Sequence, residues 1–253
     1  MAPVTIEDFQ IGRVVSRTFG VFARNLITFL IVALLFMLPA LAVDFYVGTP
    51  NYFVAGTTKG WMFGVLAGVT QLVCPYLLSA ALVKATITDL NGERPSLGSA
   101  LSTGFALFLP VLVLALMSLF GIMLGSALLL VPGLILMCGW SVVIPVRVTE
   151  NTSLMQTFGR SWDLTNGYRW KIFGLLVMYI IIIFLLSFVT RVISGVSFAQ
   201  AATTTGSIPY ISLTWLVSAF VGVLTAVGVA AIYYELRTVK EGIAPQQLAA
   251  AFD

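Results

Sequence analysis

Long runs of apolar residues dominate the chain and predict helices that cross a membrane. A transmembrane helix needs about 20 mainly apolar residues, and six segments of the sequence meet this requirement. They are residues 26–43, 61–83, 105–125, 127–146, 172–189 and 210–234. The third and fourth come from one uninterrupted apolar stretch, which is too long for a single span. We predict that this stretch turns within Gly121–Ser126, which would place Pro132 in the first turns of the next helix.

Composition supports this interpretation and excludes most soluble proteins. Hydrophobic residues make up 59% of the 253 residues and charged residues only 9%, whereas soluble domains carry roughly 25% charged residues. So few polar side chains could not cover the exterior of a soluble protein of this length. We therefore predict an all-α polytopic membrane protein with a single integral membrane domain over residues 1–253.

Basic residues lie almost entirely on one side of the predicted spans. Of the 13 Lys and Arg residues, all except Lys59 and Arg191 fall in the termini or in the connections on the same side as the termini. The positive-inside rule then predicts that both termini are cytoplasmic. A cleavable signal peptide ending near Ala40–Ala42 is an alternative for the first apolar segment. The stretch before that segment is long and acidic for a signal peptide, since it contains Glu7 and Asp8.

A short amphipathic segment precedes each odd-numbered span. The segments are Thr5–Asn25, Ser96–Leu109 and Ser153–Leu164, and each begins with a residue suited to an N-cap. Their large apolar residues recur every three or four positions, which places them on one helical stripe. The stripes are Ile11, Val15, Phe19 and Phe22; Leu97, Leu101, Phe105 and Phe108; and Leu154, Phe158 and Trp162. We predict three cytoplasmic interfacial helices and a threefold pattern of interfacial helix, span, turn and span. Such helices would recognise lipid or a partner, or only anchor the connections.

Small residues recur every four positions in three of the spans. They are Gly60, Gly64 and Gly68; Gly121 and Gly125; and Ser218, Gly222 and Ala226. This spacing lets helix backbones approach closely. We predict packing within the chain, and the alternative is a face for a second membrane protein or a second copy.

The predicted spans hold no Asp, Glu, Lys or Arg, which argues against a proton-driven pump. Gln71 is the polar side chain that is costliest to leave unpaired there, so we expect it to bond across helices. The chain has no histidine, and both Cys74 and Cys138 lie in apolar runs. No residue pattern predicts a catalytic site, a metal site or a cofactor site, and no basic patch interleaved with aromatic residues indicates nucleic-acid binding.

Basic and aromatic residues near the start of the fifth span are candidates for contacts with lipid headgroups. They are Arg160, Arg169, Trp170 and Lys171. A basic residue near the surface attracts anionic lipid, and a Trp residue there is typical of an interfacial anchor. The alternative is that these are ordinary positive-inside residues, or that they pair with acidic residues at the ends of other helices.

Three stretches carry a resemblance to a known family. They are LNGERPSLGSAL at Leu90–Leu101; Pro132, Gly133, Pro145 and Glu150 followed by FGRSWDLTNGYRWKIF at Phe158–Phe173; and YYELRTVKEG at Tyr233–Gly242. Together they resemble a bacterial family of six-span proteins, the stand-alone YciC-like proteins. That family is related to the membrane domain fused to some glycerophosphoryl diester phosphodiesterases. The resemblance implies a bacterial inner-membrane protein. It does not imply the phosphodiesterase activity, which belongs to a separate soluble domain, and no site residue is transferred with it.

Two functions remain after these exclusions. The first is a non-catalytic membrane protein that acts as an accessory, scaffold or assembly factor of a membrane complex, or that organises lipid. Its partners would be membrane lipids and another integral membrane protein. The second is a permease or lipid-handling transporter with a cavity between the spans. A polar cavity lined by Gln71 would favour the second function, and a continuously packed interior would favour the first.

Overall fold

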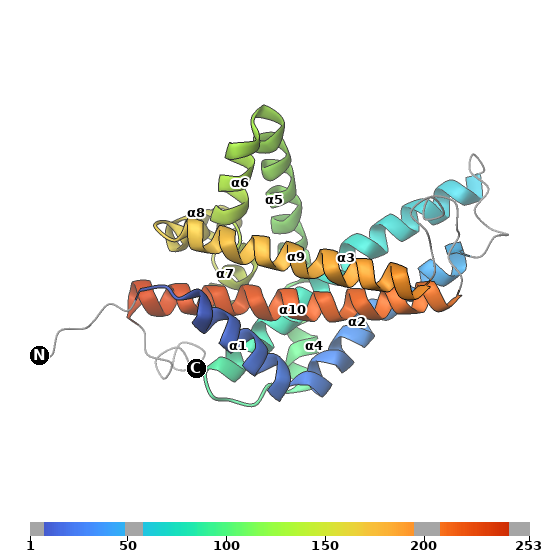
Figure 1. Ribbon diagram of the computed structural model, residues 1–253, viewed down its shortest axis with the longest axis horizontal. Helices are drawn as coiled ribbons and strands as arrows, with labels where there is room; N and C mark the ends of the chain where they lie inside the picture. Colours follow the sequence, from blue (N-terminus) through green and yellow to red (C-terminus); the bar gives the residue numbers. More distant parts are fainter. Residues whose placement is uncertain (1–7, 49–57, 195–207, 243–253) are drawn as a thin grey trace, which may run out of the picture.

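The computed structural model describes residues 8–48, 58–194 and 208–242, and the regular structure of these residues is α-helical throughout (Figure 1). The helices are α1 (Ile11–Arg24), α2 (Leu26–Gly48), α3 (Thr58–Leu90), α4 (Leu97–Ala106), α5 (Phe108–Leu128), α6 (Leu130–Gly139), α7 (Val143–Glu150), α8 (Leu154–Thr165), α9 (Arg169–Ser194) and α10 (Ile208–Glu241). Within the described residues, six segments are long and apolar enough to cross a membrane. They are Leu26–Phe45, Gly60–Leu90, Phe108–Leu128, Leu130–Glu150, Arg169–Ile193 and Ile211–Glu241. The chain is an all-α polytopic membrane protein, as predicted.

The connection between the third and fourth spans differs from the prediction. Helix α5 continues through Gly121–Ser126 and ends at Leu128, so that Leu129 alone joins it to α6. The glycines serve close packing instead of a turn. A Cβ atom built on Gly121 would lie 2.3 Å from Cζ3 of Trp140, and one on Gly125 would lie 2.8 Å from Cδ1 of Leu136. The predicted turn at Gly121–Ser126 is therefore wrong. The small residues there allow close contact between helices, as they often do in membrane proteins.

The fourth span is broken into two helices. It runs as α6 to Gly139 and resumes as α7 at Val143, where a single helix over residues 127–146 was expected. Pro145 lies in the first turn of α7. A proline lacks the N–H group that would continue the hydrogen bonds of a preceding helix, and its ring clashes with the preceding turn. The break before α7 follows from this residue. Pro132 lies in the first turn of α6, as predicted.

The three repeated units pack in a cyclic order. Each interfacial helix contacts the even-numbered span of the preceding unit: α4 packs on α3, α8 packs on α7, and α1 closes the ring by packing on α10. Helices α3, α7 and α10 contact one another and form the centre. The odd-numbered spans α2, α5 and α9 lie outside, each between its own unit's even-numbered span and that of the preceding unit. The sequence pattern of interfacial helix, span, turn and span thus corresponds to a repeated arrangement in space.

The interior between these helices is packed with apolar side chains. Leu78 and Leu82 of α3 and Val223 and Val227 of α10 are fully buried in one cluster with residues of α2. A second cluster joins α7 and α9 to the other half of α10.

Each interfacial helix buries a small residue against the bundle, and the three predicted apolar stripes differ in how far they are buried. Thr18, Gly104 and Ser161 are buried, whereas Phe19 and Phe105, which follow the first two, are exposed. The stripes of α1 and α4 are thus partly exposed, whereas the stripe of α8 packs on the protein. A Cβ atom on Gly139 would lie 2.5 Å from Cε3 of Trp162, and the Phe158 ring lies edge-on to Trp140. Among the predicted N-caps, Ser96 accepts a hydrogen bond from the N–H of Ser99 through Oγ (3.2 Å), and the N–H of Ser153 donates to Oε1 of Gln156 (3.2 Å). Helix α1 begins at Ile11, later than predicted, and Thr5 lies outside the described residues.

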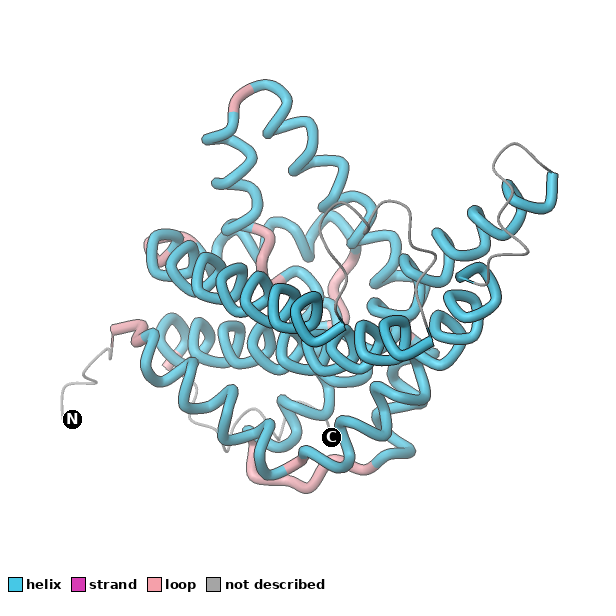
Figure 2. Tube along the Cα trace, turned by 45° about the vertical axis from the view of Figure 1, so that its right-hand side comes forward, coloured by secondary structure: helices cyan, strands magenta, loops and turns pink. Residues whose placement is uncertain are grey.

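The outer end of the α5–α6 hairpin projects away from the other helices, sideways from α9 and α10, with its tip far from theirs (Figures 1 and 2). The tip is entirely apolar, and Leu128, Leu129, Leu130 and Val131 are all exposed.

Candidate functional site

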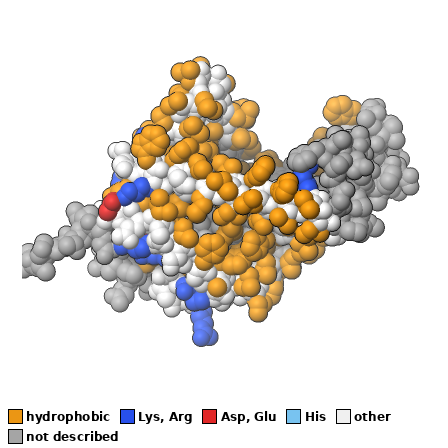
Figure 3. All heavy atoms as spheres, viewed as in Figure 1, with side chains coloured by type: hydrophobic (Ala, Val, Ile, Leu, Met, Phe, Trp, Pro, Cys, Tyr) orange, Lys and Arg blue, Asp and Glu red, His pale blue; other side chains and the backbone are white. Residues whose placement is uncertain are grey.

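An apolar groove lies between α1, α9 and α10. Its volume is about 120 Å³. Figure 1 shows α1 and α9 on opposite sides of α10, which forms the floor of the groove. Hydrophobic side chains cover this face of the molecule (Figure 3). The lining includes Val15 of α1, Leu175, Met178 and Ile182 of α9, and Val229 of α10.

The contacts of α1 define the limits of the groove. Thr18 lies against α10, since a Cβ atom on Gly228 would lie 4.0 Å from its Cγ2 atom. Ile11 lies against α9, since a Cβ atom on Gly174 would lie 3.9 Å from its Cδ1 atom. Small residues at both points let α1 approach the two spans. On the α9 side the groove is lined by larger side chains, among them Leu175, Met178 and Ile182.

The polar groups that line the groove bond among themselves. The Tyr179 hydroxyl and Oγ1 of Thr225 form a hydrogen bond, and Thr225 Oγ1 also bonds to the carbonyl oxygen of Val221. Oγ1 of Thr18 donates to the carbonyl oxygen of Val14 (2.8 Å). The groove therefore offers an apolar surface, and its chemistry suits an alkyl chain better than a polar solute. An apolar cavity of about 150 Å³ stays dry and binds benzene, so this groove has room for a segment of one acyl chain.

A buried carboxylate joins α1 to α10 beside the groove. Glu235 has none of its surface exposed. It accepts hydrogen bonds from Nε of Arg13 (2.8 Å), from Arg17, and from the N–H of Gln10 (3.4 Å). The Arg17 guanidinium also lies over the ring of Tyr234, 5.0 Å from its centre. This cluster fixes α1, and therefore one wall of the groove, to the central span.

The membrane-crossing helices extend beyond the predicted spans and therefore include charged residues, two of which are the acidic residues Glu235 and Asp44. Glu235 lies one residue beyond the predicted sixth span but within the helix that crosses. Asp44 likewise lies within the first span as the structure has it. Nε2 of Gln71 donates to Oδ2 of Asp44 at 2.9 Å, which confirms the expected bond across helices. Gln71 is exposed on the outside of the bundle, so it does not line a central cavity.

A second charged cluster joins α7, α8 and α10. Arg160 pairs with Glu150 (2.9 Å) and with Glu241, and Nε of Arg237 pairs with Glu241 (2.8 Å). The Tyr233 hydroxyl donates to Oε1 of Glu150 at 2.8 Å. Burial disfavours the charged form of Arg160, but the hydrogen bonds to Glu150 and Glu241 outweigh this effect and raise the pKa of Arg160. This candidate for a lipid contact is thus engaged with two carboxylates.

The other three candidates for headgroup contacts lie around the start of α9. The guanidinium of Arg169 lies 3.7 Å from the centre of the Trp162 ring. Trp170 is exposed, with its ring edge-on to Phe173. Nζ of Lys171 lies 2.5 Å from Oδ2 of Asp8 and 2.9 Å from the carbonyl oxygen of Phe9. Lys171 is the candidate that lies next to the groove, because α1 meets α9 at Gly174.

The small residues have different surroundings. Gly121, Gly125, Gly222 and Ala226 lie against neighbouring helices, and a Cβ atom on Gly222 would lie 3.1 Å from Cδ2 of Leu78. Gly60 is buried, Ser218 is exposed, and a Cβ atom on Gly64 or Gly68 would meet no atom of the described residues within 4 Å. The first turns of α3 therefore leave an open face.

The described residues contain no group of three or more His, Cys, Asp or Glu residues that could hold a metal ion. No protein-family model matches the chain, and comparisons with curated proteins and with solved structures also give no match. The resemblance to the YciC-like family stays a prediction, and the function has to be inferred from the geometry.

Proposed function

We propose that this protein is a non-catalytic membrane protein that organises lipid, by holding an acyl chain in the groove between α1, α9 and α10. The observation that carries the proposal is the apolar lining of this groove, whose polar groups are already paired with one another. Two of the apolar side chains that line it, Phe19 of α1 and Met178 of α9, are also exposed on the surface of the protein. In a membrane, lipid chains are the molecules that such a surface meets. The proposed location is a bacterial inner membrane, with both termini in the cytoplasm.

The packed interior supports this function over a permease. Leu78, Leu82, Val223 and Val227 fill the space where α3 and α10 meet. Gln71, which would line a polar pathway if the protein were a permease, lies outside the bundle beside Asp44. A solute would have to separate packed helices in order to pass, whereas a lipid reaches the groove from the side.

One observation favours the accessory or scaffold function as a second candidate. Gly64 and Gly68 leave an open, exposed face at the start of α3. Glycines at this spacing let a helix of another membrane protein approach closely. A protein partner that copurifies at fixed stoichiometry, and is lost from a Gly64→Leu variant, would support this candidate.

Native mass spectrometry after purification in a mild detergent tests the lipid proposal. Met178 lines the groove and is 38% exposed, while its neighbour Val177 is 37% exposed and lies outside the lining. Met178→Trp should fill the groove and remove most of the retained lipid. Val177→Trp adds a similar side chain at nearly the same depth and should retain lipid as the wild type does.

Circular dichroism would show that both variants keep their helices. Equal lipid retention in the two variants would contradict the proposal, because lipid would then bind without using the groove.

A further inference from the structure

Lys171 lies on the same face of α9 as the residues that line the groove. The groove-lining residues Leu175, Met178 and Ile182 follow it at intervals of four, three and four positions. Residues at these intervals share one face of a helix. Lys171 therefore stands one helical turn before the lining begins, at the end of the groove where basic residues gather. Trp170, exposed next to it, has the character of an interfacial anchor. This is the level at which the headgroup of a lipid would lie if its chain occupied the groove.

The ammonium group of Lys171 is held in place by more than its acidic partner. The carbonyl oxygen of Phe9 accepts a hydrogen bond from Nζ at 2.9 Å. Phe9 is itself buried and stacks on Tyr168, with ring centres 5.6 Å apart. Nζ also lies 5.7 Å from the centre of the Tyr168 ring. These contacts would keep the ammonium at the same position if Asp8 moved away.

Among the ion pairs of the described residues, the acidic partner of Lys171 is the most exposed to solvent. The side chain of Asp8 is 69% exposed, whereas Glu235, Asp89, Glu150 and Glu241 are each largely or fully buried. An exposed ion pair contributes little to stability, since water and salt screen it. Another anion could therefore replace Asp8 with little loss, while the basic residues of the other pairs stay engaged.

We propose that Lys171 binds the phosphate of an anionic phospholipid in place of the Asp8 carboxylate, while an acyl chain of the same lipid lies in the groove. This inference rests on the proposed function and names its lipid class. The anionic class follows from charge: the ammonium of Lys171 and the guanidinium of Arg13 both contact Asp8, which is the acid that the phosphate displaces. In this arrangement Asp8 competes with the lipid phosphate for Lys171 and so lowers the affinity of the protein for the lipid.

Opposite effects of two substitutions test this competition. The full chain would be reconstituted in nanodiscs of phosphatidylcholine with a small fraction of phosphatidylglycerol, and the phosphatidylglycerol retained after transfer to detergent would be measured. Lys171→Gln should lower its retention about fivefold, as expected for one basic residue near the surface. Asp8→Asn removes the competing carboxylate and should raise retention. Phosphatidylcholine carries the same phosphate together with a compensating choline cation, so its retention should change less than that of phosphatidylglycerol in either variant.

Arg94→Gln is the matched control for Lys171→Gln. Arg94 is exposed in the connection between α3 and α4, so this substitution removes the same charge away from the groove and should leave retention unchanged. If Lys171→Gln and Arg94→Gln behave alike while Met178→Trp loses lipid, the headgroup site is refuted and the groove stands. If Met178→Trp also retains all lipid, the proposed function fails as well. A fall in retention in Asp8→Asn would likewise refute the competition.

Discussion

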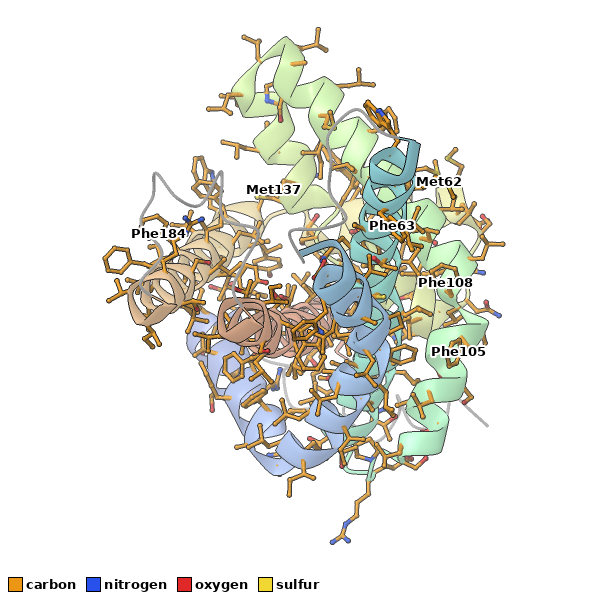
Figure 4. All side chains as sticks on the ribbon, turned by 90° about the vertical axis from the view of Figure 1, so that its right-hand side faces the viewer. Met62, Phe63, Phe105, Phe108, Met137 and Phe184 are labelled. Atoms are coloured by element: carbon orange, nitrogen blue, oxygen red, sulfur yellow. The ribbon has the colours of Figure 1, made fainter. Side chains whose placement is uncertain are left out.

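Helices α9 and α10 are neighbours in sequence and in space, yet the molecule uses them in opposite ways. Helix α9 has the higher mean hydropathy of the two. Of the residues in its most apolar segment, however, only 11% are buried within the protein, against 44% for α10. Large side chains project from α9, and Figure 4 shows Phe184 directed outward. Helix α10 instead carries Gly222, Ala226 and Ala230 where α2 and α3 approach it. Hydropathy thus indicates which helices cross the membrane, and residue size indicates which of them form the centre.

The groove follows from this difference. Helix α1 packs closely on α10 through Thr18 and Gly228, and its position is fixed by Glu235. It cannot pack as closely along α9, whose side chains are larger. The space left between them is the candidate lipid site, at the boundary between the packed centre and the lipid-facing surface.

The largest expected effect comes from breaking the bond between α1 and the centre. Glu235→Gln removes a fully buried carboxylate that accepts hydrogen bonds from Arg13 and Arg17. Removing one partner of a buried ion pair costs about 3 kcal/mol or more in the free energy of unfolding. Denaturant unfolding in detergent micelles would measure this loss. The exposed Glu93→Gln serves as the control and should change stability by less than about 0.5 kcal/mol. A similar small change in both variants would show that Glu235 does not hold α1.

A smaller effect is expected from enlarging a residue on each of the two helices. Ala226→Leu adds bulk where α10 is fully packed, and overpacking of this kind costs about 1–3 kcal/mol. Val177→Phe adds bulk on the exposed face of α9 and should change stability by less than about 0.5 kcal/mol. Thermal unfolding of the two variants would compare them. Equal losses would mean that α9 is also packed, against a partner or a second copy.

The smallest effect concerns the pair at the end of the groove. The hydrogen bond from Lys171, aided by the charge of Arg13, holds the pKa of Asp8 below its usual value. A lowered pKa in the folded state means that the pair stabilises the fold above the usual Asp pKa of about 3.9 and that this contribution is lost as the pH falls through the lowered pKa. Between about pH 5 and pH 3, the wild type should therefore lose slightly more thermal stability than Asp8→Asn. An identical pH dependence in both proteins would show that the pair adds nothing.

The sequence was sufficient for the number and order of the spans, because each is marked by its own apolar run. It also located the interfacial helices, since their stripes repeat every three or four residues. The groove and the Glu235 cluster could not be predicted this way. Arg13 and Glu235 are 222 residues apart, and their pairing depends on α1 closing the ring of repeats. The turn at Leu129 was not predicted, because a pair of glycines is compatible both with a turn and with close helix packing. The break before α7 could have been predicted from Pro145.

Photo-crosslinking with a lipid tests the central claim most directly. Phosphatidylglycerol carrying a diazirine on one acyl chain would be added at low mole fraction to nanodiscs containing the protein, and the labelled residues would be mapped by mass spectrometry. The account predicts that half-buried groove residues, such as Val15 and Val229, are labelled more strongly than the exposed Phe184 or the exposed hairpin tip at Leu128–Val131. Labelling that simply follows exposure, with Phe184 and the hairpin tip above Val15, would contradict it.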